Sequence, residues 1–271
     1  MYVAVSRTDD LYVVQSSRPV RVILNLSEKT AGYLRGIARG SAPGKGRPPL
    51  PFKPAEIILA LDPYFPQAAS EPLAPVIQQL AGLGYRQYMV NNPGHFSLFR
   101  SLRPDVQLIA GPWLYMFNSW ALSFVASLGA DAFVSPLENN RQNLERTFGT
   151  DSRNPLRAMA FIPVFALPPL FRIRADLRPA YGFRTFSDNL DENFTLVTGP
   201  EGSTVIPEKP FSITDKIPFL KEAGFRRFII DLSGPPLKKR DYKDLMRAVD
   251  TGAPLPRVSR FNWKDGFQKN E

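Results

Sequence analysis

A helix that ends at a glycine and leads straight into an apolar strand recurs along this chain, and this junction constrains the fold more than any other feature. It occurs at Leu83-Gly84-Tyr85, at Leu128-Gly129-Ala130 and at Ala223-Gly224-Phe225. Glycine ends a helix readily because it adopts the left-handed backbone conformation at low cost. The strands that follow are apolar on both faces, which is typical of a parallel sheet covered by helices. The sequence therefore predicts an α/β fold. We favour a (β/α) barrel-like or partial barrel with mainly parallel strands over an open doubly wound sheet.

The predicted barrel domain covers residues 1–234, and its first segment, residues 3–14, is expected to form one or two strands. Two short apolar runs, 194–198 and 204–206, flank a turn that contains glycine and proline, so a small β-hairpin insertion is expected there. Residues 235–271 are polar and basic, and we expect them to form a tail against the surface with a last helix near its start.

Composition excludes several kinds of active site. The chain has no cysteine and a single histidine, His95. Disulfides, thiolate zinc sites, iron–sulfur ligation by this chain and a cysteine nucleophile are therefore excluded, and a histidine-rich metal site is excluded as well. We expect no cofactor and no metal. The formal net charge of +9 favours an anionic partner, with nucleic acid as the obvious candidate.

No targeting signal opens the chain, because its first residues lack a basic segment followed by a long apolar one. We therefore expect a cytoplasmic protein. Residues 106–130 carry no charge and are long enough to span a bilayer, but Gly111, Pro112, Asn118 and Ser119 interrupt the apolar run. This pattern favours a buried strand followed by a buried helix, with no membrane span.

Polar residues follow several of the predicted strands, where a barrel would gather them at one mouth. Asn91, Asn118, Glu138 and Asp231 each come after an apolar run and before a turn or helix, and Asp62 ends a further strand. Glu138 could act as a catalytic acid or base, or it could complete the capping box Ser135-Pro136-Leu137-Glu138 of a following helix. Asn118 could bind substrate or cap a helix. Asp231 could act as a base, although turn formation explains both aspartates as well.

His95 is the only side chain that could carry out histidine-dependent acid–base catalysis. It follows the turn-forming sequence Asn92-Pro93-Gly94, so a structural role at the turn is the alternative.

Basic and aromatic residues alternate in the segment from Phe171 to Phe186. Arg172 and Arg174 are the candidate substrate-binding residues, because such alternation can hold a phosphate backbone and stack bases. A solvated loop with partly buried stems is the alternative. The partners expected from this reasoning are RNA or a peptide substrate, without a membrane.

Several sequence blocks together resemble the collagenase-like peptidase family U-32. These blocks are Trp113-Leu114-Tyr115-Met116-Phe117-Asn118-Ser119-Trp120-Ala121, Leu128-Gly129-Ala130-Asp131-Ala132 and Val134-Ser135-Pro136-Leu137-Glu138. The resemblance is clearest over residues 85–235. It implies a protease, hence a hydrolase, with a barrel fold. Relatives that hydroxylate RNA bases or quinone precursors hold an iron–sulfur cluster with cysteines that this chain lacks.

The resemblance covers what would be the C-terminal portion of the family architecture. It therefore implies a partner chain that supplies an N-terminal half. No serine here has a recognisable nucleophile context, and a metal protease would lack its histidines. A carboxylate mechanism stays open. Three functions remain as expectations: a U-32-like peptidase without a recognisable complete catalytic site, the substrate-binding half of an RNA or quinone-precursor hydroxylation system, and a non-catalytic scaffold.

Overall fold

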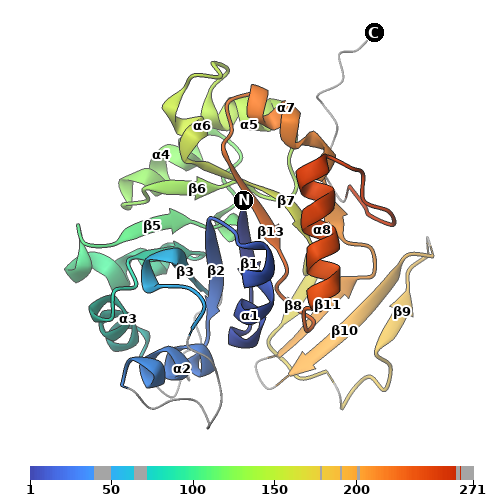
Figure 1. The fold of residues 1–271 in the computed structure, drawn as a ribbon, viewed down its shortest axis with the longest axis horizontal. Helices are drawn as coiled ribbons and strands as arrows, with labels where there is room; N and C mark the ends of the chain where they lie inside the picture. Colours follow the sequence, from blue (N-terminus) through green and yellow to red (C-terminus); the bar gives the residue numbers. More distant parts are fainter. Residues whose placement is uncertain are drawn as a thin grey trace.

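The computed structural model describes residues 1–39, 50–63, 72–177, 179–189, 191–199, 202–260 and 263. Its centre is a closed ring of parallel strands (Figure 1). In the described part of the chain eight strands form the ring, in the order β1-β2-β3-β4-β5-β6-β7-β13, and β13 pairs again with β1. Their bounds are β1 Tyr2–Val5, β2 Arg21–Leu26, β3 Ile57–Leu61, β4 Gln87–Val90, β5 Gln107–Ala110, β6 Ala132–Val134, β7 Ala160–Ala166 and β13 Arg227–Asp231. The predicted fold class is confirmed, and the barrel is closed.

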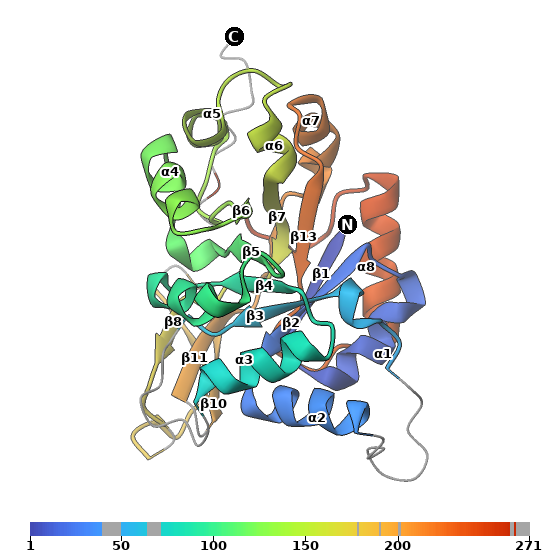
Figure 2. The same ribbon diagram turned by 90° about the vertical axis from the view of Figure 1, so that its left-hand side faces the viewer.

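Helices surround the ring and connect one strand to the next (Figures 1 and 2). The α-helices are α1 Leu11–Val14, α2 Glu28–Ala38, α3 Leu73–Gly82, α4 Ser119–Ser127, α5 Arg141–Phe148, α6 Pro155–Met159, α7 Ile217–Glu222 and α8 Lys239–Thr251. Short 3-10 helices add η1 Thr8–Asp10, η2 Gln15–Ser17, η3 Pro54–Glu56, η4 Pro93–Leu102, η5 Pro112–Leu114 and η6 Thr214–Lys216. The predicted glycine junctions are confirmed at Gly84, Gly129 and Gly224, whose φ angles of 93°, 107° and 97° suit glycine.

Two separate apolar cores fill the molecule, because successive side chains of a strand point to opposite faces. One large cluster lies between the strands and the helices and includes Val3, Leu24, Leu59 and Val90. The second cluster takes the alternate positions, which face the barrel interior: Tyr2, Ala4, Ile23, Ile58, Ala60, Met89, Ile109, Ala132, Val134, Phe161 and Ile229. This alternation fixes which residues face the barrel axis at each end of the strands.

The expected hairpin is present and belongs to a larger insertion between β7 and β13. Strands β10 (Asn193–Gly199) and β11 (Gly202–Pro207) pair antiparallel, and β9 (Thr185–Ser187) and β8 (Phe171–Ile173) flank them. This sheet stands beside the barrel (Figure 1). The chain then returns through β12 (Phe211–Ser212), which pairs antiparallel with the last part of β7.

One sequence prediction about the barrel domain needs correction. Residues 3–14 do not continue as strand, because after β1 the chain forms η1 and α1, whose Leu11 and Val14 are buried on one helical face. The last helix expected near the start of residues 235–271 is present as α8, which packs against the barrel domain. Tyr242 of α8 is buried, and its hydroxyl donates to the Ser17 carbonyl over 2.6 Å.

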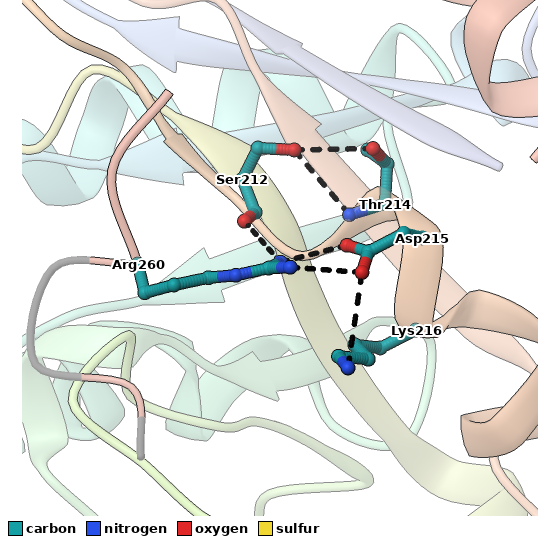
Figure 3. Close-up of polar contacts among 5 residues, drawn as sticks. All are labelled: Ser212, Thr214, Asp215, Lys216 and Arg260. Carbon is teal, nitrogen blue, oxygen red and sulfur yellow. Dashed lines mark hydrogen bonds and ion pairs between the residues drawn. The ribbon is translucent and has the colours of Figure 1, made fainter. Parts of the chain in front are cut away.

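The chain beyond α8 also returns to the barrel, and it is anchored on β12 and η6 (Figure 3). Arg260 donates two hydrogen bonds to the Asp215 carboxylate, at 2.7 and 2.8 Å, and a third to the Ser212 carbonyl. This bidentate contact lowers the pKa of Asp215. The rest of the expected tail, residues 261–262 and 264–271, lies outside the described residues.

The resemblance implied that a partner chain supplies the first half of the barrel. In this structure β1 to β4 come from the chain itself, and β1 hydrogen-bonds to both β2 and β13. The described strands of one chain therefore close the ring by themselves, and a partner chain stays a prediction. Among the described residues no helix has both the length and the apolar character needed to cross a bilayer.

Candidate functional site at the C-terminal end of the barrel

Alternation along the strands places a polar group at the C-terminal mouth of the barrel. Asp62, Asn91 and Asp231 each stand two residues beyond an interior-facing residue, namely Ala60, Met89 and Ile229. All the ring strands are parallel, so these three side chains are gathered at the same end. Catalytic and binding residues of (β/α) barrels lie at this end.

The insertion folds back onto this mouth through Arg172. Its guanidinium donates to the Asp62 carboxylate over 2.6 Å, although the two residues are 110 positions apart in the sequence. The same guanidinium lies 5.7 Å from the centre of the Trp113 ring, in the loop after β5. These contacts hold one carboxylate of the mouth beside a cation, next to an aromatic wall.

Trp113, Tyr115 and Phe117 continue this aromatic wall between β5 and α4. The rings of Trp113 and Tyr115 meet edge to face at 6.4 Å, and those of Tyr115 and Phe117 stack at 6.2 Å. Tyr115 is half exposed and has a left-handed backbone with φ of 47°, a conformation that non-glycine residues seldom adopt and that is found mostly at functional sites. Burial, with a smaller effect from the Glu138 charge, raises its pKa.

Glu138 is exposed in the loop after β6 and close enough to influence Tyr115 electrostatically. The predicted capping box is wrong, because no helix follows directly. The Ser135 hydroxyl donates to the Pro136 carbonyl and accepts a 2.5 Å hydrogen bond from Asn139, and α5 begins only at Arg141. Glu138 therefore does not cap a helix here, and a catalytic role for it stays a prediction.

His95 lies beneath the mouth and does not reach solvent. It is completely buried in η4, and its Nδ1 accepts a hydrogen bond from the backbone N–H of Asn91 over 3.2 Å. Burial lowers its pKa from 6.5 to about 4, while the nearby Asp62 charge raises it by a smaller amount. In this structure the enclosed imidazole supports the end of β4, and a catalytic role for it stays a prediction.

Asn91 is fixed more tightly than its place between a strand and a turn would suggest. Its Nδ2 donates to the Leu61 carbonyl over 2.8 Å, so it bridges the ends of β4 and β3. On the other side it lies against Gly111, where a Cβ would come within 1.8 Å of the Asn91 Oδ1 atom. That oxygen is buried and has no hydrogen-bond partner in the part of the chain that the structure describes.

Asp231 ends β13 and faces the barrel axis. Its Oδ1 accepts a hydrogen bond from the Ser233 amide over 2.8 Å. Burial raises the pKa of Asp231 above its ordinary value, and the bonds from Ser233 offset only part of that effect. Asp231 and Asp62 therefore occupy contrasting environments, one desolvated and the other beside a guanidinium.

Two predicted substrate-binding residues stand further from this cluster. Asn118 caps α4, since its Oδ1 accepts a hydrogen bond from the Ala121 amide over 2.9 Å, and this is the structural alternative that the sequence left open. Arg174 is exposed at the end of β8. RNA binding through this segment stays a prediction.

Asn25 is a residue of the mouth that the sequence reasoning missed. It is exposed although it lies inside β2, and alternation after Ile23 turns it toward the barrel axis. The available signal was a single polar residue within the run Val22-Ile23-Leu24-Asn25-Leu26. Within the described residues, no group of three or more His, Cys, Asp or Glu side chains is arranged to hold a metal ion.

The closed ring of parallel strands with its outer helices defines the chain as a (β/α)₈ barrel. No protein-family model and no curated protein sequence matches it. Among solved structures it is similar to the spore cortex-lytic enzyme SleL of Bacillus cereus, with a TM-score of 0.41 and 10% identity over 95% of this chain and 74% of that chain. It is also similar to the C-terminal domain of a putative chitinase from Desulfitobacterium hafniense DCB-2, with a TM-score of 0.29 and 8% identity over 91% of this chain and 82% of that one. Likenesses this distant say nothing about activity.

Proposed function

We propose that the chain is a hydrolase that cleaves a glycosidic bond at the C-terminal mouth of its barrel, with Asp231 as general acid. The observation that carries this proposal is the pair of inward-facing aspartates in unlike environments. Pairs of titratable groups whose surroundings differ in this way are the usual basis for dividing acid and base roles between two carboxyls.

Asp231 suits the role of the acid because burial raises its pKa and so keeps its proton to higher pH. It would protonate the oxygen of the leaving group. Asp62 suits the role of the base, because its contact with Arg172 orients the carboxylate toward the mouth. It would remove a proton from the attacking water.

The spacing of the two strands fits this division of roles. Strands β13 and β3 are separated by β1 and β2, so their ends lie three strand spacings apart, roughly 14 Å along the wall. Side chains that reach inward from both strands come closer than that. Glycosidases that place a water between their two carboxyls separate them by about 6.5–9.5 Å.

The aromatic wall supports a sugar or another ring as substrate. Tyr115 of this wall is 51% exposed. Exposed aromatic faces next to carboxylates offer apolar contact to the flat side of a ring and hydrogen bonds to its edge.

The resemblance to the U-32 family keeps a peptide substrate as the second candidate, and Asp231 and Asp62 would then activate water against an amide. The test assays the purified protein on a panel of soluble polysaccharides by release of reducing ends, and on fluorescent casein and gelatin. Asp231→Asn should lower kcat/KM on the cleaved substrate by about 10²- to 10⁴-fold, the usual contribution of a general acid or base.

The matched control is Asp244→Asn, which removes a carboxylate from the exposed face of α8. It should retain activity within twofold. Cleavage of casein without cleavage of any polysaccharide would replace the glycosidase proposal with the peptidase. An Asp231→Asn variant as active as the wild type on every cleaved substrate would remove Asp231 from the mechanism.

A further inference from the structure

A cavity of about 320 Å³ opens at the opposite, N-terminal end of the barrel. Its walls include Arg21, Gln87, Gln107 and Arg227, from the first residues of β2, β4, β5 and β13. The volume lies at the lower end of the range for small-molecule sites, about 300–1,000 Å³. None of these residues belongs to the carboxylate mouth.

The strand alternation that builds the apolar interior also points these polar side chains inward. Arg21, Gln87, Gln107 and Arg227 stand two residues before the interior residues Ile23, Met89, Ile109 and Ile229. A polar layer thus lies directly below the apolar one. The register places Arg21 beside Tyr2 of β1, and Arg227 lies two positions below Ile229, which flanks Tyr2 on its other side.

Among the described residues, the two arginines have no acidic partner within ion-pair distance. Arg21 donates to the Ala55 carbonyl over 3.2 Å, and the guanidinium of Arg227 lies 5.0 Å from the centre of the Phe161 ring. Within the described residues neither of them forms an ion pair. Two positively charged side chains that form no ion pair within the described residues therefore line the cavity.

Asp131, the acidic residue in the cavity wall, is already engaged. Its carboxylate accepts hydrogen bonds from Arg103 at 2.8 and 3.2 Å and from the Leu108 amide at 2.8 Å. Its charge is therefore balanced at the rim, and the cavity remains electropositive.

The glutamines add hydrogen-bonding groups to this charge. Gln87 donates to the Gln107 side chain over 2.9 Å, while its own Oε1 is buried without a hydrogen-bond partner in the described structure. A buried acceptor without a donor is costly and is normally satisfied by water or a ligand. The cavity thus combines two guanidinium groups with the Gln87 Oε1 atom, a buried hydrogen-bond acceptor.

We propose that this cavity binds a small oxyanion that carries a proton or hydroxyl group. Arg21 and Arg227 hold its oxygens, and its O–H donates to the Oε1 atom of Gln87. Guanidinium groups match the oxygens of phosphates and carboxylates in a planar, two-pronged geometry. The shared chemistry is that of a free hydrogenphosphate or of the carboxylate of a small hydroxy acid. The site is independent of the proposed hydrolysis at the other end.

Isothermal titration calorimetry of the full chain tests this proposal with two probes, sodium phosphate and sodium lactate, at constant ionic strength. One of the probes should bind saturably with one site per chain, and which one binds distinguishes the two sources. Arg227→Gln should weaken binding of that probe at least tenfold. The control Arg240→Gln, on the exposed face of α8, should change it less than twofold.

A second measurement on the wild-type protein does not depend on how the variants fold. Arginine modification by phenylglyoxal, read by mass spectrometry, should be slowed by the bound probe at Arg21 and Arg227 and unchanged at Arg240. Absence of saturable binding by both probes up to about 20 mM, a concentration at which even a millimolar Kd would be detected, would overturn the proposal. Equal protection of all three arginines would overturn it as well.

Discussion

His95 makes the stability of this barrel sensitive to acid. The imidazole is completely buried, and the structure lowers its pKa from 6.5 to about 4, first because burial disfavours the charged ring. In the unfolded chain the same ring would titrate near 6.5. Between these two values the unfolded state holds a proton that the folded state lacks.

Proton binding to His95 links the free energy of unfolding to pH. Because the unfolded state binds more protons, the free energy of unfolding falls as the pH falls from about 6.5 to about 4, and His95 causes no further loss below that. One pKa unit corresponds to about 1.4 kcal/mol, so the loss due to His95 is about 3 kcal/mol. This is a large fraction of the roughly 5–15 kcal/mol typical of a folded domain.

Proton NMR can measure this pKa without ambiguity, since the chain has one histidine. Its imidazole signal should titrate near pH 4 in the folded protein. Urea unfolding at a series of pH values from 7 to 4 should show the corresponding loss of stability.

The control variant is His95→Gln, which keeps an acceptor for the backbone N–H of Asn91 and does not titrate. The difference in unfolding free energy between wild type and variant should shrink by about 3 kcal/mol from pH 7 to pH 4. A constant difference over that range, or an imidazole that titrates between pH 6 and 7, would refute the burial argument.

Three further predictions follow from single contacts. Gly111→Ala should destabilise the protein by about 1–3 kcal/mol in urea unfolding, because its Cβ would displace the side-chain amide of Asn91. An unchanged midpoint of urea unfolding would contradict this packing. Tyr242→Phe should cost about 1 kcal/mol, the usual worth of a buried hydrogen bond, by removing the bond to Ser17, and no loss would mean that α8 is not anchored there. Asp231→Asn should raise the melting temperature at pH 7 by a few degrees, because it removes a carboxylate whose ionised form is disfavoured by burial. This gain should fade toward pH 3, because the raised pKa makes only the ionised Asp231 destabilising; a gain that does not depend on pH would contradict it.

The barrel could be predicted because its signal is local and repeated. Each helix–glycine–strand junction is set by a few neighbouring residues, and three such junctions fix a parallel arrangement. The prediction failed where the pattern was short or ambiguous. In residues 3–14 the apolar residues suit a strand as well as a helix, and only packing of Leu11 and Val14 against the barrel decides for α1.

The site could be predicted only in its strand-borne part. Asp62, Asn91 and Asp231 were identifiable because each follows an apolar run, and parallel strands bring such positions together. The partner of Asp62 was not identifiable, because Arg172 reaches it from an insertion 110 residues away. The burial of His95 was likewise hidden, because its turn-like sequence gives no sign that η4 packs it beneath the mouth.

The same period of two residues that aims the aspartates at one end of the barrel aims the arginines at the other. Asp62 and Asp231 lie beyond the apolar interior layer, and Arg21 and Arg227 lie before it. Acidic and basic groups on one strand, such as Arg227 and Asp231 on β13, are thus separated by packed residues that exclude water. The barrel thus carries these two carboxyl groups at one end of its interior and these two guanidinium groups at the other, with the apolar layer between them. The two ends of one barrel therefore suit different chemistry. Carboxylates at the C-terminal mouth suit proton transfer, and guanidinium groups at the N-terminal end suit the binding of anions.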